Sequence, residues 1–97
     1  MKIVTITANF APADIPEALT CLKSAQVDAL QSIDCLKYQI CIDAESSGSI
    51  FIIHMWKDNA SFEIYRTSEM FGKTIAELGP LMTTAPESLS YDAQQVT

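Results

Sequence analysis

The stretch from Ile50 to Lys57, IFIIHMWK, constrains the fold most, because it reads as a strand that is apolar on both faces. Alternate residues of a strand face opposite sides, and one side carries three apolar side chains: Phe51, Ile53 and Met55. On the other side the only histidine, His54, lies between Ile52 and Trp56. Such a strand is typical of the centre of a sheet that is covered on both faces.

Periodicity and turn residues around this strand predict the remaining elements. In chain order we expect a strand over residues 2–8, a helix of about 18 residues beginning near residue 14, strands over 35–43 and 50–57, a helical region broken into 60–66 and 69–78, and a strand over 88–93. Within the first helix an apolar stripe runs from Ile15 to Ile33. In the strand over 35–43, simple alternation places Leu36 and Tyr38 on the same face.

The predicted order βαββαβ indicates an α+β fold. With right-handed crossovers it becomes a four-stranded antiparallel sheet with its helices on one face, the ferredoxin-like arrangement. The other face then has no helix to cover it, although the strand over 50–57 is apolar there too. Two sheets packed face to face would cover both apolar faces, so we expect a homodimer.

Length, charge and the first residues narrow the classes of protein. A chain of 97 residues predicts a single domain, residues 1–97. The net charge is −6 with only six Lys and Arg, which argues against binding to nucleic acid or to anionic membranes. No segment reaches the roughly 20 apolar residues that span a bilayer. The start, MKIVTITANF, resembles a strand and not an export signal, so we expect a cytoplasmic protein.

The three cysteines do not have the spacing of a metal site or a disulfide framework. Cys21, Cys35 and Cys41 fit neither a zinc ribbon nor a CxxC redox pair. We therefore expect small buried thiols in a reducing compartment, and no metal site.

Four motifs carry a resemblance to a known family. They are D-C-L-K-Y at 34–38, F-x-x-x-x-W-K-D at 51–58, Y-x-x-S-x-x-F at 65–71 and L-x-P-L-M at 78–82. The chain resembles the antibiotic biosynthesis monooxygenase family from Ile3 to Tyr91, and this family includes quinol monooxygenases and an autoinducer-2 phosphate isomerase. The resemblance implies a dimeric α/β barrel and oxygenation without a cofactor.

The chain departs from the family at two ionisable positions. Many members carry Glu in place of His54 and His in place of Tyr65. In the haem-degrading branch, the haem-ligating His corresponds to Ile75 and a strand Asn to Thr5, so haem degradation is not expected.

If the implied oxygenation takes place, we expect its site to be formed by side chains around His54. The expected substrate is a small phenolic or quinol compound of the polycyclic aromatic class. Such a compound can donate its own electron to O2, so the protein needs only a base or hydrogen-bonding group in an apolar pocket. We expect His54 to act as the base and Tyr65 as a donor to a substrate oxygen. Trp56 and Phe62 would contact an aromatic ring, and Asn9 would orient it. Each of these side chains could instead be a packing residue or, for Asn9, a turn former.

Two other functions stay open. An isomerase would need a cationic group for a phosphate, and Arg66 is the best placed of four candidates, the others being Lys37, Lys57 and Lys73. A small-ligand-binding or regulatory domain without turnover is the third reading, which the residues at His54 and Tyr65 favour somewhat.

Overall fold

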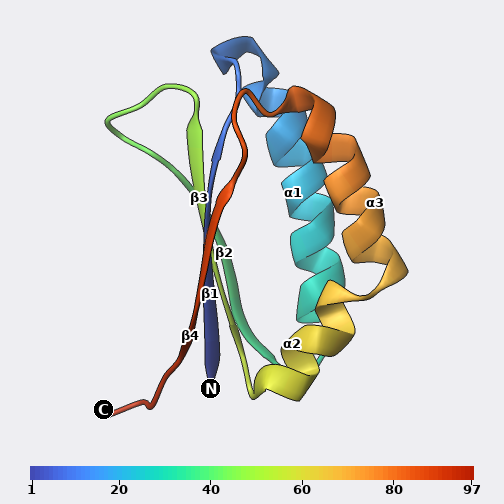
Figure 1. The fold of residues 1–97 in the computed structure, drawn as a ribbon, viewed down its shortest axis with the longest axis vertical. Coiled ribbons are helices and arrows are strands. Elements are labelled where there is room, and N and C mark those ends of the chain that lie inside the picture. The colour runs from blue at the N-terminus through green and yellow to red at the C-terminus, as the bar shows by residue number, and fades with distance from the viewer.

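The computed structural model describes residues 1–97 as a four-stranded antiparallel sheet with all of its α-helices on one face (Figure 1). The elements are β1 (Lys2–Asn9), α1 (Ile15–Leu30), β2 (Cys35–Ile42), β3 (Ser49–Trp56), α2 (Asn59–Arg66), α3 (Glu69–Leu78) and β4 (Glu87–Asp92), with 3₁₀ turns at Pro12–Asp14 and Gly79–Leu81. The strand order is β2-β3-β1-β4. The predicted ferredoxin-like topology is confirmed.

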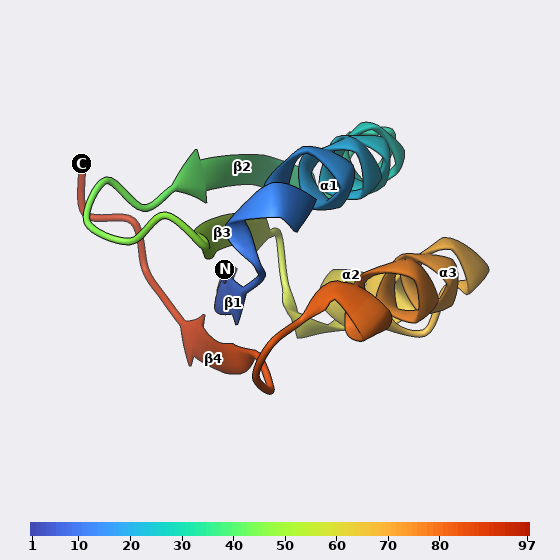
Figure 2. The same ribbon diagram turned by 90° about the horizontal axis from the view of Figure 1, so that it is seen from above.

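The strand β3 is central, as predicted, but helices cover only one of its faces. It pairs with β1 over its whole length and with β2 on the other side. Seen from above, the sheet forms one layer, and α1, α2 and α3 form the other (Figure 2). Ile52 and His54 are buried beneath the helices, whereas Phe51 on the opposite face is 38% exposed.

Small residues let the helix α1 lie close to the sheet. Its buried positions are Ala18, Leu22, Ala25 and Ala29. The helix ends at Leu30, and Ile33 is 92% exposed, so the apolar stripe predicted to reach Ile33 is too long. The physical reason is a turn after Leu30, in which the Ser32 hydroxyl accepts a hydrogen bond from the backbone N–H of Asp34.

The predicted break between two short helices is confirmed. Asp58 caps α2 by accepting a hydrogen bond of 2.8 Å from the Ser61 N–H, and Ser68 caps α3 by accepting one from Phe71. The second cap restarts the helix in a new direction immediately after Thr67, which is the C-cap of α2.

A register shift between Cys35 and Lys37 interrupts the alternation predicted for β2. As a result Cys35 and Tyr38 are both buried, and Leu36 is exposed, contrary to its predicted place beside Tyr38. An irregularity of this kind inserts an extra residue on one strand and reverses the faces on either side of it.

The core lies between the sheet and the helices, and Trp56, Leu22 and Ile50 are its largest fully buried side chains. The cysteines are unpaired; Cys35 is buried, whereas Cys21 and Cys41 are partly exposed. None of the helices combines the length and apolar character that crossing a membrane requires.

Candidate active site

A cavity of about 240 Å³ lies between the sheet and the helical layer. The helix α3 packs against α1 and not closely against any strand, which leaves this space open. Most of the lining is aliphatic or aromatic, and none of the fifteen lining residues is Asp, Glu, Lys or Arg. The cavity therefore suits an uncharged, largely apolar ligand.

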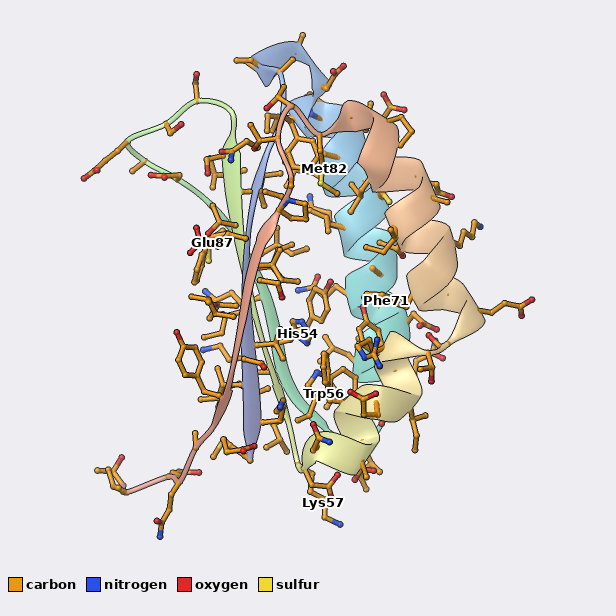
Figure 3. All side chains as sticks on the ribbon, in the orientation of Figure 1. His54, Trp56, Lys57, Phe71, Met82 and Glu87 are labelled. Atoms are coloured by element: carbon orange, nitrogen blue, oxygen red, sulfur yellow. The ribbon has the colours of Figure 1, made fainter.

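His54 enters this cavity from β3. In Figure 3 the side chains of His54 and Trp56 extend from the sheet toward the helices, with Phe71 approaching from the helical layer and Met82 farther along the same space. His54, Phe71 and Met82 all line the cavity. The histidine is 2% exposed, so its contact with solvent passes through this space.

A hydrogen bond fixes the protonation pattern of the imidazole. The indole Nε1–H of Trp56 donates to Nδ1 of His54 at 2.7 Å. Because an indole nitrogen can only donate, Nδ1 is the unprotonated nitrogen, and the proton of the neutral ring lies on Nε2. Nε2 has no hydrogen-bond partner in the protein. Every fully buried side-chain nitrogen or oxygen does have a partner, so Nε2 is not fully buried. Nε2–H is therefore accessible from the cavity.

Burial keeps His54 neutral. It lowers the pKa of the imidazole from 6.5 to about 4, since a charged ring would lose its hydration in this apolar setting. At neutral pH the ring is consequently an uncharged hydrogen-bond donor toward the cavity.

Aromatic side chains enclose the imidazole. Tyr38 stacks on it with ring centroids 5.2 Å apart, while Phe62 and Tyr65 lie at 5.7 and 5.9 Å. Burial raises the pKa of Tyr38, and burial together with the neighbouring Tyr38 raises that of Tyr65. Both phenols thus keep their protons, and both line the cavity. The arrangement can donate hydrogen bonds to an oxygen atom of a ligand.

The structure brings together some of the residues expected to form a site. His54 and Tyr65 line the cavity. Trp56 and Phe62 do not line the cavity; Trp56 donates a hydrogen bond to His54, and the ring of Phe62 lies beside the imidazole. Asn9 donates a hydrogen bond to the Thr84 hydroxyl, away from His54.

Arg66 is also outside the cavity. Its guanidinium is exposed and pairs with Glu63 at 2.7 Å, one turn earlier on α2. Neither Arg66 nor Asn9 is therefore placed to contact a ligand beside His54.

Tyr38 was not among the residues predicted for the site, although it pairs directly with His54 across β2 and β3. In a hairpin, residues at equal distances from the loop pair with each other and face the same side. Tyr38 and His54 lie at equal distances from the polar hairpin loop, so the sequence contained this signal. Thr74 and Ser88 also line the cavity, and no motif marks them. No three His, Cys, Asp or Glu side chains gather where they could hold a metal ion.

Comparisons with known proteins agree with this architecture. A crystal structure of an antibiotic biosynthesis monooxygenase matches with a TM-score of 0.88 at 21% identity, covering 98% of this chain and 100% of the other. A proposed antibiotic biosynthesis monooxygenase from Deinococcus radiodurans matches with a TM-score of 0.93 at 18% identity, covering 100% and 96%. A conserved protein from Methanosarcina mazei Go1 matches with a TM-score of 0.90 at 19% identity, covering 96% and 92%.

These identities are low, so the structural matches establish the fold. A search of the curated proteins gives no match. The family model for antibiotic biosynthesis monooxygenases matches residues 1–77, which is most of the chain. The protein therefore belongs to the antibiotic biosynthesis monooxygenase family.

Proposed function

We propose that the protein is a cofactor-independent monooxygenase that oxygenates a small phenol or quinol in the cavity at His54. The observation that carries the proposal is an uncharged, mostly apolar cavity that is lined by one imidazole with a free N–H and by two phenols. An oxygen atom on an otherwise apolar aromatic ring fits these groups. Family membership and fold support the reaction class.

The reaction balances without an external reductant. The phenol first loses its proton to solvent, because no free base lines the cavity. The phenolate passes one electron to O2, and the resulting aryloxyl radical and superoxide combine to form a carbon–oxygen bond at a ring C–H. The peroxide anion so formed takes a proton back from solvent. The peroxide loses water and leaves a carbonyl, so that for a naphthol the sum is C10H8O + O2 → C10H6O2 + H2O. Both oxygen-reducing electron pairs come from the substrate, and an apolar cavity protects the intermediates from water.

The volume of the cavity favours a substrate of one or two rings. Pockets for drug-sized ligands usually measure about 300–1,000 Å³, and the cavity here measures about 240 Å³. Naphthols and naphthoquinols are therefore better candidates than larger polycyclic compounds.

The absence of charged lining residues weighs against a phosphosugar isomerase. A phosphate needs Arg or Lys groups or a row of backbone N–H donors. No Arg or Lys lines the cavity, and Arg66 is paired with Glu63 at the surface. We therefore do not propose the isomerase reaction for this cavity.

A ligand-binding domain without turnover is the second candidate. The observation that favours it is the unprotonated Nδ1 of His54, which is occupied by Trp56 and is not free to remove a proton from a substrate. Without such a base, an oxygenase could act only on a substrate whose own hydroxyl ionises when its oxygen accepts hydrogen bonds from the cavity.

Oxygen uptake tests the proposal. The purified protein, treated with a chelator and free of flavin absorbance, is mixed with a panel of naphthols and naphthoquinols, with autoxidation subtracted. Saturable uptake that falls at least about tenfold in His54→Leu, and not in the surface variant Arg66→Gln, would support catalysis at this cavity. Binding of the same compounds without uptake above the blank would reject the monooxygenase and favour the binding domain.

We also propose that two copies of the chain pack through the uncovered face of the sheet. A sheet face on which several neighbouring apolar side chains are exposed is typical of a protein–protein interface. The side chains on this face include Phe51, Ile53, Met55, Leu89 and Tyr91. Light scattering should give twice the chain mass, and Ile53→Lys should give the single mass, whereas Ile64→Lys on α2 should not. A wild-type monomer would refute the dimer.

A cytoplasmic location is part of the same proposal. Three unpaired thiols on a small chain fit a reducing compartment, where disulfides rarely form. Fractionation of cells that produce the native chain would test the location.

A further inference from the structure

We propose that Trp56 is a positioning residue that holds His54 as a fixed Nε2–H donor, so that the cavity selects ligands by an acceptor oxygen, a quinone carbonyl or a phenolate. The inference deepens the proposed function by naming how that site recognises its ligand, and it rests on that function for the class of ligand. It also assigns His54 a different role from the base that the sequence suggests.

The backbone and the core fix the donor of this hydrogen bond. Trp56 follows His54 by two residues on β3, so both side chains leave the sheet on the same face. The indole is 1% exposed and stacks on Tyr65 with ring centroids 4.9 Å apart. Without water to compete, its N–H has Nδ1 of His54 as its partner.

Aromatic contacts fix the orientation of the His54 imidazole as well as that of the Trp56 indole. Tyr38 from β2 stacks on the ring at an interplanar angle of 25°, while Phe62 and Tyr65 from α2 contact it at steeper angles. A half-turn of the ring would break the hydrogen bond from Trp56 and leave a buried indole N–H unpaired, which costs about 1–3 kcal/mol. The Nε2–H therefore keeps one direction, toward the cavity.

No charged group near the imidazole favours its protonated form. The groups that face it are phenols and a phenyl ring from β2 and α2, and the indole on β3. From α1 and α3 the same cavity receives Leu22 and Thr74, and the Thr74 hydroxyl donates to the Met70 carbonyl. None of these groups is a carboxylate or another base, and Nε2–H donates to no group of the protein, so it remains available for an oxygen of the ligand.

The recognition of an acceptor has a simple chemical consequence. A carbonyl or phenolate oxygen accepts from Nε2–H, whereas a ligand of the same size that has only an N–H to offer leaves Nε2–H unpaired. Hydrogen bonds of this kind distinguish ligands by roughly tenfold in affinity. Charge on the phenolate strengthens the bond further.

The wild-type protein provides the first test, since His54 is the only histidine. In ¹⁵N-labelled protein at pH 7, the imidazole should show a protonated Nε2 and an unprotonated Nδ1, with a scalar coupling from Nδ1 to the indole nitrogen of Trp56. An Nδ1–H tautomer, or an absent coupling, would overturn the proposal. This measurement requires no variant and no turnover.

Trp56→Phe removes the donor and keeps an aromatic ring. The neutral ring should then populate both tautomers, because nothing in the protein holds Nδ1 unprotonated. Tyr65→Phe is the matched control, because Tyr65 contacts the same ring but donates no hydrogen bond to it, and there the tautomer should stay fixed. An unchanged tautomer in Trp56→Phe would count against the positioning role.

Ligand titration completes the test. 1,4-Naphthoquinone, which only accepts hydrogen bonds, should bind roughly tenfold more tightly than 1-naphthylamine, a ligand of nearly the same size whose N–H groups donate and whose delocalised lone pair accepts poorly, and should shift the Nε2–H resonance. Equal affinities, or a Nε2–H resonance that the quinone leaves unmoved, would refute acceptor recognition. Because neither measurement uses oxygen, the proposed oxygenation could fail while acceptor recognition holds, and the two results are separable.

Discussion

The phenol ring of Tyr38 lies against the imidazole of His54, with ring centroids 5.2 Å apart and the planes inclined by 25°. The two residues are direct partners across β2 and β3, so the backbone register fixes this contact. The contact removes one face of the imidazole from water, and the aromatic groups of α2 remove much of the rest. The protonated form of His54 is therefore destabilised in the folded protein.

The stability of the fold should decrease as the pH falls from 7 to 5. The pKa of His54 is about 4 in the folded state and 6.5 when unfolded, so between these values the unfolded chain binds the additional proton. The free energy of unfolding then rises with pH, and about 2 kcal/mol should be lost between pH 7 and pH 5. Urea denaturation at several pH values measures this loss.

The control is His54→Gln, in which the free energy of unfolding should stay nearly constant over the same range. No other histidine contributes, and Asp58 and Glu63 have a lowered pKa, so their effect falls at lower pH. A wild-type profile as flat as that of the variant would contradict the neutral, buried state of His54.

The order of the elements and the central position of β3 could be predicted because both depend on local patterns. The alternation along β3 places His54 and Trp56 on one face, and the start signal at Ser68 divides the helical region. The hydrogen bond between His54 and Trp56 could not be predicted, because it depends on side-chain rotamers within the core. Parity alone does not show whether the indole faces the cavity or the imidazole.

Features that depend on packing between distant segments could not be predicted from the sequence either. The irregularity in β2 reverses the faces of Cys35 and Leu36, and no residue type there announces it. The cavity exists because α3 packs on α1 and stands away from the strands. Asn9 and Arg66 were placed near the site from their chain positions but lie outside it, because Asn9 donates to Thr84 and Arg66 pairs with Glu63 at the surface.

Gly48 should not tolerate a side chain. The Phe10 N–H donates to the Gly48 carbonyl at 2.7 Å, and a Cβ on Gly48 would overlap the carbonyl oxygen of Phe10. Gly48→Ala should therefore lower the free energy of unfolding by about 1–3 kcal/mol. Gly72→Ala is the matched control: no atom lies near its Cβ, and alanine at this exposed position of α3 should stabilise by roughly 0.5–1 kcal/mol. Equal effects of the two changes would contradict the close approach at Phe10.

Leu22→Ala should weaken the fold and enlarge the cavity. Leu22 is almost fully buried on α1 and lines the space beside His54. Loss of the isopropyl group at the end of this side chain should lower the free energy of unfolding by about 3 kcal/mol. The enlarged cavity should also improve binding of a three-ring ligand relative to a two-ring ligand, as measured by titration. The same relative affinities in the variant and the wild type would show that these ligands bind elsewhere.

Cys21 should react slowly with alkylating agents although it is partly exposed. Burial raises the pKa of its thiol to about 11, and the hydrogen bond that the thiol donates to Glu77 at 3.3 Å is the second cause of this rise. At pH 8 alkylation by iodoacetamide should be about a hundredfold slower than for the same cysteine in urea-unfolded protein, because the thiolate is the reactive form. Mass spectrometry of the peptide that contains Cys21 gives both rates, and similar rates would contradict this environment.

Tyr65 and Arg66 are neighbours on α2 with opposite surroundings, so their substitutions should differ. Tyr65 lines the cavity, and Tyr65→Phe removes one of its few hydroxyls, so turnover or ligand affinity should fall by roughly tenfold. Arg66→Gln breaks an exposed pair with Glu63, which water screens, and should change turnover by less than about twofold. Oxygen uptake and quinone titration measure both variants. A larger loss in Arg66→Gln than in Tyr65→Phe would move the site to the surface of α2, because only a ligand bound there could contact the guanidinium.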